Sequence, residues 1–147
     1  MVMMGLPNTI AALSLSCSTT LLTKAMRGSF ATTPKKATDG VPESWFDLGF
    51  HGVADFWSPW CAAIVDGEVA SLACAARLTD SGAELGLVTA KAFRGRGFGA
   101  AATAGWSRLP TLRSRTLFYS TDRDNASSKR VASRLGLRHH GASLRIT

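Results

Sequence analysis

Three alternating glycines, together with two arginines, are the residues best suited to bind an anion. They lie in the stretch FRGRGFGAAATAGW, from Phe93 to Trp106. A glycine has no Cβ atom, so the backbone N–H groups around it can close on a phosphate, and the dipole of a helix that starts there adds favourable potential. The alanines that follow predict such a helix. The stretch therefore predicts a phosphate-binding turn at the head of a helix.

Three apolar segments of strand length precede the glycines. The first two lie in WCAAIVDGEVASLACAARL around the turn signal Asp66–Gly67, and the third, AELGLVTA, follows the turn TDSG at residues 79–82. Short connections of this kind join antiparallel neighbours. We therefore expect an antiparallel three-stranded meander that leads into the glycine stretch.

Two helices and two strands are expected after the glycines. A helix over residues 99–108 ends before Pro110, TLFYS is a short strand, and the tail LRHHGASLRIT supplies a last strand. DNASSKRVASRLG predicts the second helix, with Asp124 or Asn125 as N-cap and Gly136 at its end.

Two other classes of protein use glycines in a similar way. Gly95 to Ala100 fits the dinucleotide fingerprint GxGxxG/A, with Asp122 at the distance of a ribose-binding acid, but that fold needs a parallel sheet before the glycines. Arg-Gly segments that bind nucleic acid are longer and repetitive. The basic C-terminal half keeps nucleic-acid binding as an alternative.

A third class agrees with both the glycines and their surroundings. Arg94, Gly97 and Gly99 satisfy the pattern Arg/Gln-x-x-Gly-x-Gly/Ala at a strand–loop–helix junction, and this stretch resembles motif A of the GNAT superfamily of N-acetyltransferases. STDRDNASSKRVASRLGL resembles the second conserved block of that superfamily, and VDGEVASLA is similar to the hairpin that leads into its core. The resemblance covers about residues 60–138. It implies an α/β (α+β) fold, with a mixed, mostly antiparallel sheet and helices packed on both faces.

The resemblance implies acetyl-CoA as co-substrate, inserted between two diverging strands. Leu87, Val88 and Thr89 would lie along the pantetheine arm and the thioester, and Asn125, with Ser128 nearby, would lie beside that arm at the start of the later helix. A plain helix cap is the alternative role of Asn125. The pyrophosphate would be surrounded by the residues of the glycine turn: Arg94, Gly95, Arg96, Gly97, Phe98, Gly99 and Ala100.

The implied reaction is direct attack of an amine on the thioester. It needs a base or a water chain, because only the neutral amine attacks. Glu84 is the one acidic residue in the strand that leads to the glycines and is the candidate catalytic base; an exposed strand-end carboxylate is the alternative. A backbone N–H group near Val88 could stabilise the oxyanion.

Two departures from the family's pattern bear on catalysis. Many members carry a tyrosine in the second block that protonates the leaving thiolate, and Ala132 stands at the matching position. Tyr119, the only tyrosine of the chain, is either a buried structural residue or a substitute catalytic acid. The usual last strand, which helps to form the acceptor site, is short or missing. The resemblance therefore does not tell which amine, on a small molecule or a peptide, is the acceptor.

Six large aromatic residues crowd the stretch WFDLGFHGVADFWSPW, residues 45–60. With two aspartates and His51 they could form an acceptor pocket for an amine. The alternatives are packing of a loop or helix over the sheet, and a surface that pairs two copies in a homodimer. His139 and His140 are adjacent, so in a strand they point to opposite faces, and we expect no metal site.

Charge is distributed unevenly along the 147 residues, whose net charge is +7. Residues 37–90 hold eight acidic residues against Arg77 alone, and residues 91–147 hold twelve basic residues against Asp122 and Asp124. A basic half suits the anionic CoA, and an acidic middle suits a cationic amine.

The N-terminal part is interpreted as a separate segment. Residues 1–38 predict a modest helix around residues 9–26, with a targeting or disordered tail as the alternative, and TTPKKATDGVPES predicts a linker. Residues 39–147 are the predicted acetyltransferase domain.

Cysteine usage and hydropathy bear on the compartment. The chain has three cysteines, Cys17, Cys61 and Cys74, and no CxxC pair. An odd number argues against a disulfide framework and therefore indicates a reducing compartment. No apolar run reaches the roughly 20 residues of a membrane span. We therefore expect a cytoplasmic protein without a membrane partner.

These features together predict an N-acetyltransferase that moves the acetyl group of acetyl-CoA to an amine. One alternative is a CoA-binding module of the same fold without efficient transfer, which Ala132 and the short C-terminus favour. The other alternative is a basic nucleic-acid-binding protein, which would present a continuous basic face.

Overall fold

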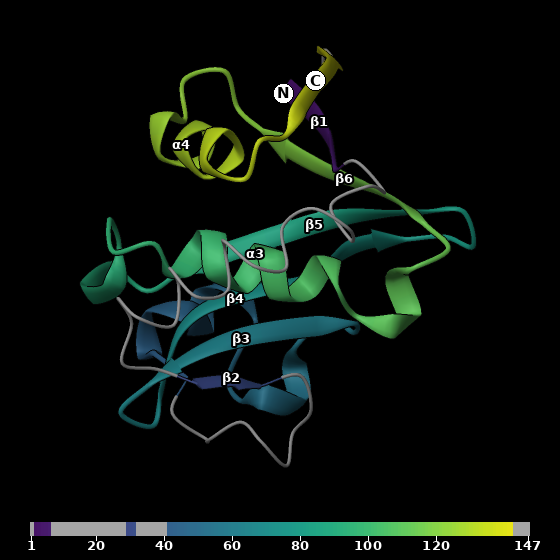
Figure 1. Cartoon of the computed structure of the whole chain (residues 1–147). Helices are drawn as coiled ribbons and strands as arrows, with labels where there is room; N and C mark the ends of the chain where they lie inside the picture. The colour runs from purple at the N-terminus through teal and green to yellow at the C-terminus, as the bar shows by residue number, and fades with distance from the viewer. Residues whose placement is uncertain (1, 7–28, 32–40, 143–147) are drawn as a thin grey trace.

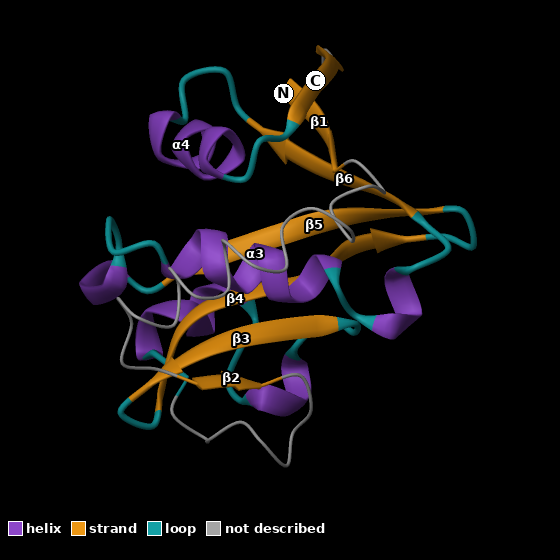
Figure 2. Ribbon diagram, viewed as in Figure 1, coloured by secondary structure: helices purple, strands orange, loops and turns teal. Residues whose placement is uncertain are grey.

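A seven-stranded mixed sheet forms the framework of the domain (Figure 1, Figure 2). The computed structural model describes residues 2–6, 29–31 and 41–142. The strands follow the order β2-β3-β4-β5-β6-β1-β7, and every neighbouring pair is antiparallel except β5–β6. Their bounds are β1 Val2–Leu6, β2 Ser29–Ala31, β3 Trp60–Val65, β4 Glu68–Leu78, β5 Gly82–Thr89, β6 Thr116–Thr121 and β7 Arg138–Ala142. The predicted mixed, mostly antiparallel sheet is confirmed.

The predicted meander corresponds to β3, β4 and β5. Asp66, with φ of 49°, and Gly67, with φ of 84°, make the tight turn between the first two strands, a left-handed backbone that these residue types tolerate. The second turn is closed by Thr79, whose hydroxyl accepts the N–H of Gly82 at 2.9 Å. The two turns bring the end of β5 directly to the glycine stretch.

Two α-helices, α3 and α4, and several 3-10 helices accompany the sheet in the described residues, and α4 has a predicted capping residue at each end. Asn125 is the N-cap of the second α-helix and accepts the N–H of Ser128 at 2.9 Å, and Gly136, with φ of 65°, follows its end. Of the two predicted caps, Asn125 is therefore the one that forms. The bounds of the described helices are α3 Phe98–Ser107 and α4 Ala126–Arg134, with the 3-10 helices η2 Glu43–Leu48, η3 Val53–Asp55, η4 Lys91–Phe93 and η5 Pro110–Leu112.

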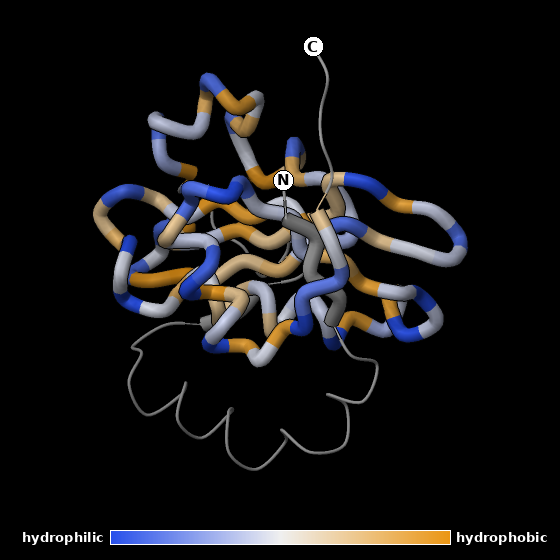
Figure 3. Tube along the Cα trace, turned by 90° about the horizontal axis from the view of Figure 1, so that it is seen from above, coloured by the Kyte–Doolittle hydropathy of each residue, from blue (hydrophilic) through white to orange (hydrophobic). Residues whose placement is uncertain are grey.

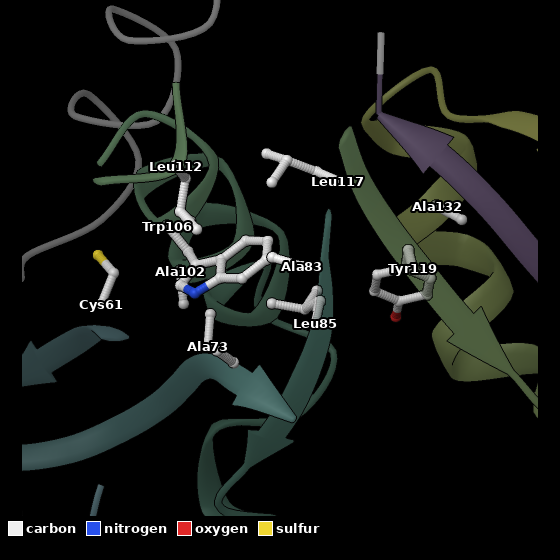
Figure 4. Packing of buried hydrophobic residues seen from close by; sticks show 11 residues of the cluster. Cys61, Ala73, Ala83, Leu85, Ala102, Trp106, Leu112, Leu117, Tyr119 and Ala132 are labelled. Carbon is white, nitrogen blue, oxygen red and sulfur yellow. The ribbon is translucent and has the colours of Figure 1, made fainter. Parts of the chain in front are cut away.

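Small side chains bring α3 close to one face of the sheet. Ala102 is fully buried there, and a Cβ atom added at Gly105 would lie 2.6 Å from the Sγ atom of Cys61. The ring of Trp106 is also fully buried, and its indole N–H donates to the carbonyl of Pro59 at 2.8 Å, so its polar atom is satisfied. Figure 4 shows this layer, which continues to α4.

The aromatic segment, residues 45–60, covers the face of the sheet opposite α3 through η2 and η3. Trp45, Phe50, Phe56 and Trp60 are buried in one cluster with Leu72 of β4. Their rings meet edge to face, the arrangement that aromatic pairs favour. The segment therefore packs over the sheet, and the face opposite α3 is covered by 3-10 helices. Hydrophobic residues concentrate along the central strands between these two coverings, as Figure 3 shows.

The polar residues of the same segment also have structural contacts. The carboxylate of Asp55 accepts the N–H groups of His51 at 2.8 Å and Gly52 at 3.0 Å. Phe46 and Trp57 remain exposed, so a surface that pairs two copies stays a prediction.

Two strands from the first 38 residues belong to the sheet. β2 pairs with β3, and β1 lies between β6 and β7, antiparallel to both. The expectation of a short or missing last strand stays a prediction; β7 is the last strand of the described residues, and β1 separates it from β6. The predicted helix around residues 9–26 lies outside the described residues. The division at residue 38 stays a prediction, although strands from both sides of it share one sheet.

Candidate active site

The parallel strands β5 and β6 separate before they end (Figure 1). Their pairing runs from Gly82 opposite Thr116 to Leu85 opposite Tyr119, whereas β5 continues to Thr89. A pocket of about 550 Å³, which we call the inter-strand pocket, lies at this separation. It is lined by Glu84, Leu85, Leu87, Val88, Thr89, Arg94, Tyr119, Ser120, Thr121, Asp122, Asn125, Ser127, Ser128 and Val131.

The backbone of β5 turns some of its N–H and carbonyl groups toward this pocket. The N–H of Ala90 donates to the carbonyl of Ala70 in β4 at 3.0 Å. Because strand groups alternate in direction, Val88 also points its backbone groups at β4, whereas those of Leu87 and Thr89 point away from β4 toward the pocket. The backbone N–H groups near Val88 that face the pocket are therefore those of Leu87 and Thr89, and an oxyanion donor here stays a prediction.

The pocket is lined from both faces of the sheet. Leu85 and Tyr119 belong to the core cluster under α3 and α4, so their neighbours Glu84 and Ser120 point to the opposite face. The Ser120 hydroxyl is the one buried side-chain polar atom without a hydrogen-bond partner in the described residues. A ligand on the helix side and a second ligand on the other side could therefore meet between the strands.

Glu84 stands at the closed end of the separation, where its carboxylate forms an ion pair with Arg77. The Nε and Oε2 atoms are 3.6 Å apart; the Arg77 side chain is 69% exposed and that of Glu84 only 17%. The predicted base is thus mostly sheltered and lines the pocket. Its role as a catalytic base stays a prediction.

Tyr119 projects from β6 toward α4, as Figure 4 shows. Its phenolic oxygen lies 2.6 Å from the Ser128 hydroxyl oxygen, and the phenol also donates to the Ser128 carbonyl at 3.3 Å. Burial raises the pKa of Tyr119 above its ordinary value of 10, and the hydrogen bond to Ser128 partly offsets the rise. The phenol is therefore a proton-bearing group at neutral pH that lines the inter-strand pocket. Ala132 instead packs into the core.

The glycine stretch forms a second, contiguous pocket of about 300 Å³, the glycine-loop pocket. Gly95 and Gly97 have φ of 75° and 89°, a left-handed conformation that favours glycine. The pocket is lined by Thr89, Phe93, Arg94, Gly95, Gly97, Phe98, Gly99, Ala100, Ser127, Arg130, Val131 and Arg134, of which Thr89, Arg94, Ser127 and Val131 also line the inter-strand pocket.

The start of α3 leaves backbone donors free at this pocket. The first helical hydrogen bond runs from the N–H of Ala101 to the carbonyl of Gly97 at 3.1 Å, and no side chain caps the helix. The N–H groups of residues 98–100 consequently have no acceptor within the helix. A Cβ atom at Gly99 would lie 3.2 Å from Thr89 Oγ1, so glycine lets the helix start approach β5.

The two arginines of the glycine stretch have different positions. Arg94 lines both pockets, and its Nε donates to the carbonyl of Thr89 at 3.1 Å. The guanidinium of Arg96 lies over the rings of Phe93 and Phe98, 5.5 Å and 5.3 Å from their centroids, and Arg96 lines neither pocket. Of these two predicted pyrophosphate ligands, only Arg94 lines a pocket; both assignments stay predictions.

Helix α4 contributes pocket residues that the sequence analysis missed. Ser127, Arg130, Val131 and Arg134 line the glycine-loop pocket. Their spacing of i, i+3, i+4 and i+7 places them on one helix face. That spacing was visible in the sequence, but only the packing of α4 beside α3 shows that the face turns to the glycines.

The described part of the chain gives no support to a metal site, a membrane-spanning helix or a reactive cysteine. No group of three or more His, Cys, Asp or Glu residues could hold a metal ion there, and His139 and His140 are exposed on β7. No described helix has the length and apolarity needed to cross a membrane. Burial raises the pKa of the Cys61 and Cys74 thiols to about 11, so neither is an activated nucleophile.

Comparison with protein families matches residues 19–138 to the acetyltransferase (GNAT) domain. The chain belongs to the GNAT family. The match spans most of the chain, including the meander, the glycine stretch and α4. The dinucleotide-binding alternative is excluded by the same architecture, because the sheet that leads into the glycines is antiparallel.

One solved structure, the first of the two that follow, shares the fold of this GNAT domain. An acetyltransferase of the GNAT family from Colwellia psychrerythraea is 17% identical, with a TM-score of 0.59, over 94% of this chain and 52% of that chain. A GCN5-related N-acetyltransferase-like protein from Streptococcus suis is 23% identical, with a TM-score of 0.48, over 55% of this chain and 32% of that chain. This chain thus spans about half or less of the length of those proteins. The comparison with curated proteins gives no match.

Proposed function

We propose that this GNAT protein transfers the acetyl group of acetyl-CoA to an amine of a small molecule or a peptide. The observation that carries the proposal is the continuity of the two pockets. The inter-strand pocket exposes strand backbone, and the glycine-loop pocket exposes the N–H groups of a helix start. Such a sequence of groups suits a ligand with an amide-bearing arm at one end and a pyrophosphate at the other.

The residues of the glycine-loop pocket fit a pyrophosphate. Free N–H groups at residues 98–100 and the guanidinium of Arg94 supply donors, and the missing side chains of Gly95 and Gly97 leave the backbone accessible. Phe98 contributes its backbone only, since its ring packs in the core. Asn125 and Ser128, which line the inter-strand pocket, would contact the pantetheine arm along Leu87, Val88 and Thr89.

The two faces of the inter-strand pocket suggest separate approaches for the two substrates. Acetyl-CoA would enter on the helix side, and the amine would approach from the opposite face, where Glu84 points. Glu84, directly or through water, takes a proton from the ammonium form of the amine, and the neutral nitrogen then attacks the thioester carbon. The nitrogen of the resulting tetrahedral intermediate releases its second proton to solvent, as Glu84 releases the first. The N–H of Leu87 or Thr89 stabilises the oxyanion.

Collapse of the tetrahedral intermediate breaks the carbon–sulfur bond and releases CoA as a thiolate. Tyr119, through the Ser128 hydroxyl, can supply the proton that the thiolate takes up, and the phenol then regains a proton from solvent. The close contact of these two hydroxyl groups supports this role.

Calorimetric titration of acetyl-CoA into the wild-type protein and a Gly97→Glu variant tests the proposal. A carboxylate at this position should abolish binding by repelling the pyrophosphate. Gly97→Ala is the matched control, because it strains the same left-handed backbone, which costs about 1–2 kcal/mol, without adding charge. We expect it to bind more tightly than Gly97→Glu. Failure of folded wild-type protein to bind acetyl-CoA would overturn the proposal.

A screen of amines that monitors free thiol follows the titration. It separates the enzyme from the alternative of a CoA-binding module, which the core position of Ala132 favours. Acetyl-dependent thiol release with any amine class supports transfer, and binding without release supports the module. We also propose a cytoplasmic location, which the free thiols of Cys61 and Cys74 support.

A further inference from the structure

Helix α4 turns two arginines toward the glycine-loop pocket. Arg130 and Arg134 are one helical turn apart and line the pocket together with Ser127. The opposite face of the helix carries Ala132 into the core. The core contact thus fixes which face of α4 meets the pocket.

The positive charge on this wall has no acidic partner. Arg94, Arg130 and Arg134 line the pocket, and no acidic residue does. Helix α4 itself contains no Asp or Glu, and the one ion pair among the described residues joins Arg77 to Glu84 elsewhere. Three uncompensated guanidinium groups around one pocket raise its affinity for an anion of high charge.

A pyrophosphate alone does not account for all three groups. The free N–H groups of residues 98–100 and Arg94 lie on the loop side, next to the inter-strand pocket. Arg130 and Arg134 line only the glycine-loop pocket, on the wall formed by α4. A ligand that uses both walls carries a further phosphate beyond its pyrophosphate. CoA has one such group, on its ribose.

We propose that Arg130 and Arg134 bind the ribose phosphate of CoA and make the protein selective for CoA over donors that lack this phosphate. The proposal rests on the proposed function, since it assigns the nucleotide end of the same ligand. Arginine suits the role, because its planar group donates two parallel hydrogen bonds to a phosphate. Dephospho-CoA and phosphopantetheine would lose these contacts.

The test measures the dissociation constants of CoA and dephospho-CoA by calorimetry. Wild-type protein should bind CoA about 10-fold or more tightly than dephospho-CoA, the size expected for charge-assisted hydrogen bonds. The Arg130→Gln/Arg134→Gln variant should lose most of this difference while its affinity for dephospho-CoA changes little. Arg123→Gln/Lys129→Gln is the matched control, because it removes the same charge from exposed residues that line neither pocket.

Each outcome decides a distinct point. Equal affinity of wild-type protein for the two ligands would overturn the role of the α4 arginines while leaving the proposed function intact. A preference for CoA that survives in the Arg130→Gln/Arg134→Gln variant, or that falls equally in the control, would also overturn it. Absence of binding to either ligand would overturn the proposed function together with this inference. Thermal unfolding of each variant verifies that it is folded.

Discussion

The hydroxyl oxygens of Tyr119 and Ser128 lie 2.6 Å apart and join strand β6 to the first turn of helix α4. Both residues line the inter-strand pocket on the side where β6 leaves β5. The contact therefore places a pair of exchangeable protons beside the proposed path of the thioester.

Removal of the phenol should slow transfer more than it weakens binding. We expect Tyr119→Phe to lower kcat about 10-fold or more, since general acids contribute at least this much, with little change in the Kd of acetyl-CoA. Ser128→Ala should give a smaller loss in kcat, because water can replace the relay. Steady-state kinetics and calorimetry measure the two quantities. Unchanged kcat in Tyr119→Phe would assign the phenol to structure alone.

The carboxylate of Glu84 is the proposed base. Glu84→Gln keeps the shape of the side chain, so we expect a fall in kcat/KM of about 100-fold with unchanged acetyl-CoA affinity. The loss should shrink as pH rises and more of the amine is already neutral. Glu68→Gln on the exposed β3–β4 turn is the control for loss of one negative charge. A pH profile of Glu84→Gln parallel to that of the wild type would contradict the role.

Arg77, the ion-pair partner of Glu84, tests whether the pair positions the carboxylate. Its side chain is mostly exposed, and exposed ion pairs contribute at most about 1 kcal/mol. Arg77→Gln should therefore leave the protein folded, as measured by urea unfolding. A kcat/KM that falls as far as in Glu84→Gln would show that Arg77 positions the carboxylate.

Asn125 caps α4 and lines the inter-strand pocket, and two substitutions separate these roles. Asn125→Ala should lower the free energy of unfolding by about 1 kcal/mol, and Asn125→Ser should recover most of it, since serine is an effective N-cap. We expect both variants to weaken acetyl-CoA binding several-fold, because neither keeps the amide. Full affinity in Asn125→Ser would reduce the role of Asn125 to that of a cap.

The contact between α3 and β3 leaves no room for a methyl group. An added Cβ atom at Gly105 would lie 2.6 Å from the buried Cys61 Sγ atom. Overpacking should make Gly105→Ala less stable by about 1–3 kcal/mol despite the higher helix propensity of alanine. Adding Cys61→Ala removes the clash and should recover part of this loss. Urea unfolding measures both variants, and additive losses would place the cause elsewhere.

Alkaline pH should destabilise the protein through buried groups. The pKa values of Cys61 and Cys74 are raised by burial from 9.0 to about 11, and that of Tyr119 is raised above 10. Because each folded pKa exceeds its unfolded value, the stability from these groups is complete below about pH 9 and is lost as pH rises toward 11. Thermal unfolding from pH 7 to 11 should show a shallower decline in Tyr119→Phe. An identical decline would contradict this origin.

The local elements were predictable because their signals are local. Asp66–Gly67 at the first turn, Asn125 as a cap and Gly136 after α4 each act on neighbouring residues, and the structure shows them in those positions. Local signals in the sequence could not show that Arg94 lines the pockets and Arg96 does not. The rings of Phe93 and Phe98 hold Arg96, and that contact depends on how the loop turns in space.

The pocket itself was foreseen only through the family resemblance. Leu87 and Tyr119 look like ordinary strand residues, and no local signal says that β5 and β6 separate after Leu85. The place of β1 was missed for a related reason. A short apolar segment predicts a strand, but its partners lie at the other end of the chain.

That long separation has a consequence for the order in which the domain folds. Val2 pairs with Thr121 and Ala142, which lie far from it along the chain. Contacts so distant along the chain form slowly. The meander and α3 can assemble from neighbouring parts of the chain, whereas β1 has to wait for its partners β6 and β7. Closure of the sheet beside the candidate active site is therefore a late step in folding, in which β1 joins two strands that are distant from it along the chain.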